Sequence, residues 1–361
     1  MKAFRWAGNA SWVVAWVLGS GIAFAQPGAL APPPSAVRKQ KALEFLDRSG
    51  GRWVTDHSCV SCHSGWSYGF ARIGTPGWET SAARELEAYI VRRQSDWDHI
   101  DPWYGSRESS KGTESFGSEG VLGAATLVEL DLARGLQQAS AATQLAIRHM
   151  LALVQPDGSL PWLDYRLQPL ESTQARIFGS ALAQVALSRS KLSTRPEFAS
   201  SSSKLSAYLK SAFTASSTPL YYKIAIGWAA SATPGLLTSA QIQGLVQSTT
   251  SIQRPDGGWS MNALGAWSKQ GSFPWSGAQQ SDANATSYLL MVLTRIQAGS
   301  GTAVAIPGLA GAVQGARAWM LAHQEADGSW PGNSVNMDSS ENHEYMQDLA
   351  TAFAVKSLGD F

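Results

Sequence analysis

The sequence predicts an all-α protein built from about six helical pairs. Three turn segments resemble one another, an amphipathic helical pattern precedes each turn, and a run rich in Ala, Gly and Ser follows it. A pair of this kind cannot bury its own apolar face, so neighbouring pairs must pack together. We therefore expect one domain from residue 37 to residue 361.

The turn segments carry the clearest repeat signal. They read QPDGSLPW (Gln155–Trp162), QRPDGGW (Gln253–Trp259) and QEADGSW (Gln324–Trp330). Asp-Gly supplies a turn in which the glycine can take a positive φ. We expect the Gln to hydrogen-bond backbone groups at a helix end and the Trp to pack over the neighbouring turn.

The helices follow from the apolar spacing on either side of these turns. The predicted outer helices before the three turns are 142–154, 239–252 and 312–323, and the inner helices after them are 172–187, 281–293 and 347–358. Weaker pairs join 83–97 to 118–133 and 203–213 to 221–232. A first outer helix is expected within 41–53, ending in a Gly-Gly-x-Trp turn, and its inner partner begins near Gly65.

The N-terminal segment reads as a secretory signal peptide. Lys2 and Arg5 form a positive region, 12–22 is an apolar run, and Ala23–Ala25 offers an A-x-A cleavage site before Gln26. We expect a signal peptide over 1–25, a Pro-rich linker over 26–36 and a periplasmic or secreted mature chain without a transmembrane segment. The other interpretation is an uncleaved anchor.

Composition narrows the classes of partner. The 361 residues carry a formal net charge of +1, which favours neither nucleic acid nor an anionic membrane surface. Trp is abundant at 15 residues, which favours buried stacking or a cavity with aromatic walls.

The only two cysteines of the chain lie in one motif. Cys59-Val60-Ser61-Cys62-His63 has the form C-x-x-C-H, which is the attachment sequence of c-type haem. Thioethers from Cys59 and Cys62 would hold the porphyrin edge, and His63 would be the proximal iron ligand. A redox motif, a simple disulfide and a zinc site are the alternatives, although the first needs a βαβ context and the last two further ligands.

The sixth iron ligand is left open by the sequence. No Met occurs between His63 and Met150, and His99 and His343 are the leading candidates. Met346 and Met337 are weaker ones, and an open position would favour O₂ or peroxide chemistry. His57 stands too near Cys59 to reach the opposite face, and we expect His149 and His323 to be packing or surface residues.

The Q-x-x-D-G-x-W repeats resemble the QW motifs of the squalene-hopene cyclase and protein prenyltransferase superfamily. The resemblance extends over nearly the whole mature chain and implies an α/α toroid, in which an inner helical ring lies within an outer one. In that arrangement 59–63 falls just before the first inner helix, near one rim of a central cavity.

The familiar chemistries of that superfamily lack their residues here. The chain has no D-x-D-D motif, no third Cys for a prenyltransferase zinc site, no G-C-G-E-Q thioester motif and no second barrel. Fold alone does not give function. A carbohydrate-active α/α toroid fits the architecture, but the turn repeats argue against it.

Other polar and aromatic residues fall where a rim or an inner helix is expected. The candidate acids are Glu119, Glu171, Asp282, Glu341, Glu344 and Asp348, for which helix capping and dipole compensation are the competing interpretation. The candidate mouth aromatics are Trp66, Tyr68, Trp97, Trp103, Tyr104, Trp267, Trp275 and Tyr345.

Three functions remain open. The first is a haem redox enzyme that oxidises an apolar ligand of terpenoid size. The second is an electron-transfer or haem-sensing protein with a periplasmic redox partner, in which the toroid is a scaffold. The third is a haem-free, cyclase-like protein that binds lipids or terpenoids and in which Cys59 and Cys62 form a disulfide.

Overall fold

The computed structural model describes residues 35–57, 64–267, 280–299, 306–336 and 340–358. The side chains at residues 35–36 and 340–342 are not among those described. These residues belong to one compact unit, Ser35–Phe361. In the described ranges the regular structure is helical, and strand-like pairing is limited to a single bridge between Leu167 and Glu171.

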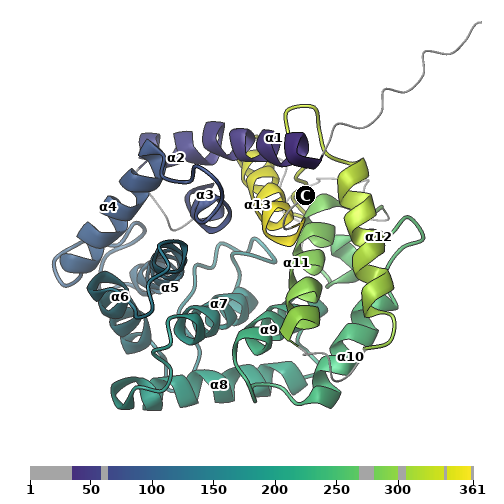
Figure 1. Cartoon of the computed structure of the whole chain (residues 1–361). Helices are drawn as coiled ribbons and strands as arrows, with labels where there is room; N and C mark the ends of the chain where they lie inside the picture. The colour runs from purple at the N-terminus through teal and green to yellow at the C-terminus, as the bar shows by residue number, and fades with distance from the viewer. Residues whose placement is uncertain (1–34, 58–63, 268–279, 300–305, 337–339, 359–361) are drawn as a thin grey trace, which may run out of the picture. The chain divides into compact units, whose positions relative to one another are not determined.

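The helices alternate between an outer and an inner layer (Figure 1). The outer helices are α1 (Ser35–Arg48), α2 (Gly50–His57), α4 (Ser81–Ser95), α6 (Ala141–Ala152), α8 (Ala199–Thr214), α10 (Ser239–Thr250) and α12 (Leu309–Ala322). The inner helices are α3 (Ser64–Arg72), α5 (Ser110–Ala133), α7 (Arg176–Arg189), α9 (Leu220–Ala232), α11 (Ala283–Gly299) and α13 (Ser340–Leu358). Short 3₁₀ helices occupy Thr173–Ala175, Pro196–Phe198 and Met261–Ala263.

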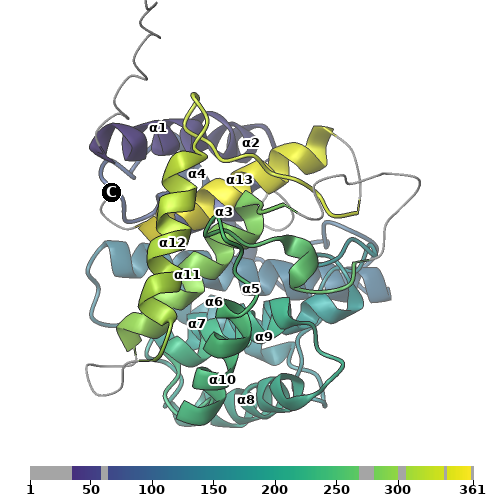
Figure 2. The same ribbon diagram turned by 90° about the vertical axis from the view of Figure 1, so that its right-hand side faces the viewer.

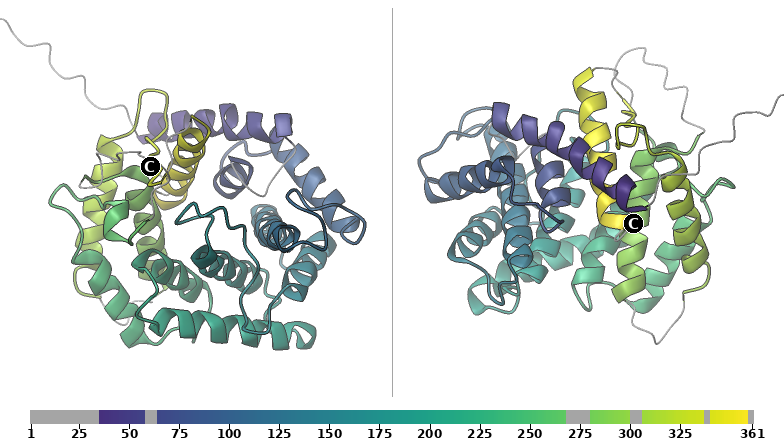
Figure 3. Two further views of the ribbon diagram at one scale, coloured as in Figure 1. Left: turned by 180° about the vertical axis from the view of Figure 1, so that it is seen from behind. Right: turned by 45° about the horizontal axis from the view of Figure 1, so that its top comes forward.

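The inner helices form a closed ring. Each packs against the next, α3 on α5, α5 on α7, and so on to α13, which packs against α3. Figures 2 and 3 show the same two layers from the side and from behind. The predicted α/α toroid of six helical pairs is therefore confirmed over the described residues.

Burial explains which helix joins which layer. On the outer helix α6 the buried side chains are Thr143, Ala146, Ile147, Met150 and Leu151, a single stripe at helical spacing. On the inner helix α5 every residue from Phe116 to Val128 is buried. A helix that is apolar or small on all sides can lie only inside, which is why the inner runs are rich in Ala, Gly and Ser.

Each Asp-Gly turn lies between the two helices of a pair and packs against the next outer helix. Gly158, Gly257 and Gly328 have φ of 88°, 90° and 97°. A Cβ built on them would lie 2.2–2.5 Å from a backbone oxygen of α8, α12 or α1. The glycines are therefore required both by the turn and by the close approach of the next helix.

The first of the three turns departs from the predicted pattern. Gln155 donates its backbone N–H to Ser159 O, as Arg254 does to Gly258 O, so this copy is one residue shorter than the others. Leu160, not Trp162, takes the buried place that Trp259 and Trp330 occupy.

The predicted Gly-Gly-x-Trp turn near residue 50 is wrong. Gly50 and Gly51 lie in α2, which continues almost directly from α1. A Cβ on Gly50 would lie 2.7 Å from the Cβ of Tyr68, and one on Gly51 would lie 3.4 Å from that of Ala82. These glycines let α3 and α4 approach α2 closely, because glycine has no Cβ.

All inner helices run in the same direction, because each follows an antiparallel outer partner. The ring therefore has an N-terminal mouth, where the inner helices begin, and a C-terminal mouth, where they end. Across the described part of the chain, no helix combines the length and the apolar character needed to cross a membrane.

Candidate functional site

The C-x-x-C-H motif lies outside the described residues, between two described helix ends. The helix α2 ends at His57, and α3 begins at Ser64. Cys59, Cys62 and His63 precede Ser64 in the chain, and the helix that Ser64 begins starts at the N-terminal mouth. In the described ranges no group of three or more His, Cys, Asp or Glu side chains has a metal-binding arrangement.

A buried carboxylate lies beside the start of α3. Asp348, on α13, is 0% exposed, and neither of its oxygens has a hydrogen bond of normal geometry among the described residues. Burial raises the pKa of Asp348 to about 6, and the nearby hydroxyls of Ser64 and Ser49 only partly offset this effect. Ser64 directly follows His63 in the chain, so this carboxyl borders the segment that carries the motif.

Charged residues also lie where α13 meets α2, close to the start of α3. Glu344, one helical turn before Asp348, accepts a hydrogen bond from Arg52 of α2 at 3.0 Å. Ser49 Oγ lies 3.5 Å from the same carboxylate. The candidate acid Glu344 is therefore an ion-pair partner that links α13 to α2. The side chain of Glu341 lies outside the described residues.

The two leading candidates for the sixth ligand lie in different places. His343 is on α13, which packs against α3, and its Nδ1 is 3.2 Å from Gly332 O. His99 is exposed in the turn after α4, in the next repeat. Met346 is buried on α13, while Met337 lies outside the described residues.

The other histidines have packing roles. His57 stacks on Trp53 with ring centroids 3.9 Å apart, within the last turn of α2. His149 stacks on Trp97, and its Nδ1 lies 2.9 Å from Gln94 Oε1. His323 stacks in the same way on Trp319.

Two of the predicted acids are held by structural contacts. Glu119 is buried and accepts hydrogen bonds from Arg93 of α4, including one at 2.8 Å. Burial raises the pKa of Glu119, although Arg93 opposes the shift. Asp282 caps α11, because its carboxylate accepts the backbone N–H groups of Ala285 and Met261 at 2.8 and 2.6 Å.

Glu171 belongs to a loop that covers the N-terminal mouth. The loop, residues 163–172, joins the turn at Gly158 to α7 and enters the ring in Figures 1 and 3. Asn336 donates to Gln168 O at 2.5 Å from the opposite side of the ring, and Tyr222 donates to Pro169 O at 2.9 Å. Burial raises the pKa of Glu171 to about 7, against a smaller opposite effect of Lys111.

The centre of the ring is filled by aromatic side chains. They come from five inner helices and are Trp66, Phe70, Phe178, Tyr221, Trp228, Tyr288 and Phe353. Neighbouring rings in this cluster have centroids 4.8–6.4 Å apart. The centre that the described residues form is therefore a packed aromatic core under the covering loop.

Of the aromatic residues predicted to line the cavity mouth, some lie at the centre of the ring or against the covering loop, and others lie away from it. Trp66 lies in the central cluster, and Tyr104 packs edge-on against Tyr165 of the covering loop. Trp267 packs edge-on against Tyr221, and Tyr345 packs against the core. Tyr68 and Trp97 instead pack between outer and inner helices, where the Tyr68 hydroxyl lies 2.5 Å from Thr80 Oγ1 and Trp97 stacks on His149. Trp103 is exposed in the loop after α4 and donates to the Tyr89 hydroxyl. Trp275 lies outside the described residues.

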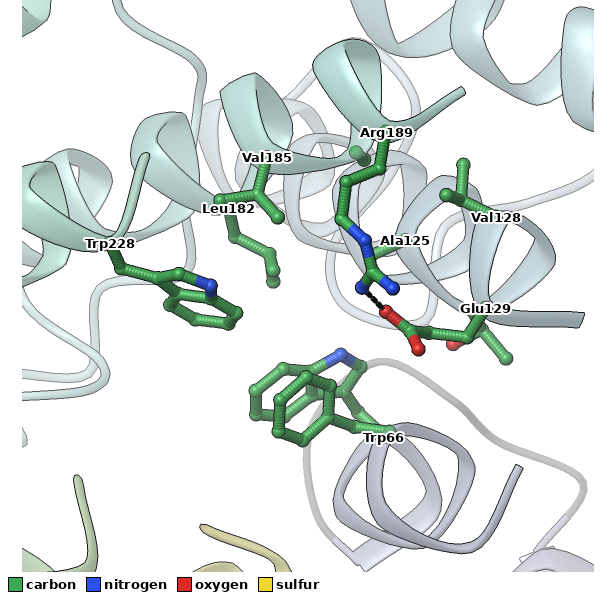
Figure 4. Close-up of a pocket in the computed structure, with 11 residues that line it drawn as sticks. Trp66, Ala125, Val128, Glu129, Leu182, Val185, Arg189 and Trp228 are labelled. Atoms are coloured by element: carbon green, nitrogen blue, oxygen red, sulfur yellow. Dashed lines mark hydrogen bonds and ion pairs between the residues drawn. The ribbon is translucent and has the colours of Figure 1, made fainter. Parts of the chain in front are cut away.

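A small pocket of about 10 Å³ remains between the aromatic cluster and the C-terminal mouth (Figure 4). Trp66, Phe70, Trp228 and aliphatic side chains of α5 and α7 line it. Glu129 and Arg189 also line it, and Figure 4 shows the hydrogen bond between them. Sequence reasoning missed this pair, although a charged residue within an apolar inner run was the available signal.

The comparisons with known proteins support the fold alone. No family model matches the sequence, and no curated protein matches it. Among solved structures, the type II terpene cyclase MstE from Scytonema has a TM-score of 0.52 and 16% identity, over 90% of this chain and 97% of that one. A variant of that enzyme in complex with geranylgeranyl dihydroxybenzoate has a TM-score of 0.51 and 16% identity, over 90% and 96%.

Carbohydrate-active enzymes share the same architecture. An inactive variant of α-1,6-mannanase from Salegentibacter sp., in complex with α-1,6-mannotetrose, has a TM-score of 0.54 and 10% identity, over 90% of this chain and 99% of that one. Terpene cyclases and glycoside-active enzymes are thus equally similar in fold, so the chemistry must be argued from this chain's own residues.

Proposed function

We propose that this protein is an exported c-type haem protein on an α/α toroid and that its function is electron transfer. One observation carries the proposal: the chain's only two cysteines and the adjoining His63 form C-x-x-C-H behind an N-terminal export signal. Cys59 and Cys62 would hold the haem covalently, and His63 would be the proximal ligand. The bound haem would supply an iron that gains and loses one electron.

The surroundings of the motif fit such a group. The orphaned Asp348 carboxyl and the Ser64 hydroxyl lie beside the helix that begins directly after His63. A metal-bound His usually donates its second ring N–H to a nearby oxygen, and buried carboxyls are among the usual acceptors. Asp348 and Ser64, at the start of α3, can therefore orient a ligand held at the N-terminal mouth.

Electron transfer is favoured because the described interior has little room for a substrate. Aromatic side chains fill the centre next to α3, and the loop 163–172 covers the mouth. A toroid that serves only as a scaffold for the haem needs no space for a substrate. His343 is the better placed sixth ligand, since α13 packs directly against α3 whereas His99 follows α4.

A second candidate is haem-dependent oxidation of an apolar ligand of terpenoid size. The apolar, aromatic lining of the small pocket at Trp66 and Trp228 favours it, together with the fold shared with MstE, a variant of which forms a complex with geranylgeranyl dihydroxybenzoate. The pocket would have to widen to admit such a ligand. A haem-free lipid- or terpenoid-binding protein with a Cys59–Cys62 disulfide is the alternative if no haem is attached.

The first test is the visible spectrum of periplasmic protein made with cytochrome c maturation factors. We expect a c-type spectrum that survives acid-acetone extraction and is lost in C62S. The histidine variants separate the ligands: H343A should convert low-spin to high-spin iron, and the matched variant H99A should leave the spectrum unchanged.

The other outcomes decide between the candidates. Colourless wild-type protein would show that the haem proposal is wrong and would leave the haem-free protein with a Cys59–Cys62 disulfide. High-spin iron in the wild type would contradict electron transfer through a six-coordinate iron and favour oxidation chemistry at an open position.

A further inference from the structure

Four charged side chains from four inner helices meet at the C-terminal mouth. They are Glu129 on α5, Arg189 on α7, Arg295 on α11 and Lys356 on α13. Arg189 Nη1 donates to Glu129 Oε1, as Figure 4 shows, and Lys356 Nζ lies 3.3 Å from Oε2. Arg295 stands 5.6 Å over the Trp228 ring and has no carboxylate within 4 Å in the described part of the chain.

The charges in this cluster do not balance. Among the described residues, Arg189 and Lys356 share the Glu129 carboxylate, and Arg295 lies near it without forming an ion pair, so three basic side chains face one carboxylate. Burial lowers the pKa of Lys356, and Glu129 opposes this shift. Burial would raise the pKa of Glu129, but Lys356 and Arg189 lower it overall, so the carboxylate is ionised. Burial lowers the pKa of Arg295 to about 10, so its guanidinium is still charged at neutral pH. Buried charge is costly unless it is paired, so a further anion would stabilise the cluster.

An open hollow adjoins the cluster from the solvent side. It measures about 440 Å³, and Lys39, Thr75, Glu129, Arg189 and Lys356 line it with apolar side chains between them. Glu129 and Arg189 line both this hollow and the aromatic pocket behind it. Cationic side chains on the floor of an open hollow are accessible to a small solute.

Helix dipoles offer a competing explanation for the cations. The carboxyl ends of helices favour positive side chains, and Arg189 and Lys356 lie in the last turns of their helices. Arg295 does not lie in the last turn of α11. The dipoles also do not explain why cations from three helices converge on one carboxylate beside a hollow.

We propose that the C-terminal mouth binds a small oxyanion with two negative charges, such as phosphate or a short dicarboxylate. Its oxygens would pair with Arg189 and Lys356, the first by the planar fork that suits oxyanions. The site lies at the opposite end of the ring from the start of α3, which follows the C-x-x-C-H motif in the chain, and it does not depend on haem attachment.

The test is calorimetric and thermal titration of the whole mature protein with inorganic phosphate, at ionic strength held constant with chloride. We expect saturable binding to the wild type and an affinity at least tenfold lower in K356Q. The matched control is R176Q at the other end of α7, where Arg176 is 3.8 Å from Asp157, and its affinity should be unchanged. Succinate, titrated in the same way, distinguishes a dicarboxylate from a phosphate preference.

A second variant keeps the proposal testable if K356Q does not fold. E129Q removes the only carboxylate that the described residues give the cluster, so phosphate should bind it several-fold more tightly and restore part of its lost thermal stability. If phosphate does no more than chloride for both wild type and E129Q, the charges form a structural ion pair only and the proposal is wrong.

Discussion

Buried carboxyl groups have different roles in different parts of the ring. Glu129 is ionised because three cations surround it, whereas Asp282 and Asp348 have few charged neighbours. Burial raises the pKa of Asp282 to about 7, despite three backbone hydrogen bonds that favour the charged form. A buried carboxyl group is therefore an ion-pair partner at one mouth, in Glu129, and a weakly acidic helix cap at the other, in Asp282.

Asp282 predicts a pH dependence of stability. Its pKa is about 7 in the folded protein and 3.8 as the reference value, so between these values the folded state binds the extra proton. The free energy of unfolding should then fall as pH rises from about 4 to 7, by at most about 1.4 kcal/mol per pH unit for this group. Chemical denaturation at several pH values measures the slope, and D282N should make it shallower.

Asp256 provides the matched control for this experiment. Its hydrogen bonds to Gly258 and Ser281 lower its pKa, against the opposite effect of burial. D256N should therefore leave the slope between pH 5 and 7 unchanged. An equal slope in wild type and D282N would show that Asp282 is ionised throughout this range.

At the level of the element, the Asp-Gly turns are the part of the repeat that the sequence describes best. The positive φ of Gly257 and Gly328 was predictable, because Asp-Gly after an amphipathic run is typical of such a turn. The helical state of Gly50 and Gly51 was not, because close approach to Tyr68 and Ala82 depends on helices not yet placed.

Gly328 should therefore tolerate no side chain. G328A combines a φ of 97° with a Cβ 2.2 Å from Lys41 O, so we expect a loss of about 2 kcal/mol or more. Gly311 is the control, because it lies exposed in α12 with open space around its Cβ position. G311A should stabilise the protein by up to about 1 kcal/mol, and effects of equal sign in thermal unfolding would contradict this account.

At the level of the whole molecule, the last repeat closes on the first. Gln324 donates through Nε2 to Arg38 O at 3.0 Å and to Gly328 O at 2.9 Å. Gln253 makes the corresponding bond to Ala312 O at 2.9 Å, so the motif that links successive repeats also links the two ends of the chain. The hydrogen bond from this Gln, which links successive repeats, therefore also links the last repeat to the first and holds the ring closed.

Ring closure predicts a measurable cost for Q324A. The variant loses two hydrogen bonds of a partly buried side chain, so we expect about 1–3 kcal/mol less unfolding free energy. Q40A is the control, since Gln40 is exposed and bonds only Glu44 on its own helix, and it should change stability by less than about 0.5 kcal/mol. Equal effects of the two variants would mean that the closing contact contributes nothing beyond a surface bond.

The candidate site was partly predictable. The C-x-x-C-H motif and its place before the first inner helix follow from the order of residues along the chain. The neighbour Asp348 could be chosen only as one of several acids, because its contact with the start of α3 depends on the last helix reaching the first. The Glu129 cluster could not be found, because its members are far apart in sequence.

Local spacing was enough to predict the helical class, the six pairs, the Asp-Gly turns and the haem-type motif, because each depends on residues within a short stretch. Contacts between distant repeats are visible only in the fold: aromatic side chains fill the centre, the loop 163–172 covers one mouth, and Glu129 pairs with Arg189 and Lys356 at the other. The physical reason is ring closure: it brings residues from distant repeats into contact, and no local pattern records which side chains will meet there.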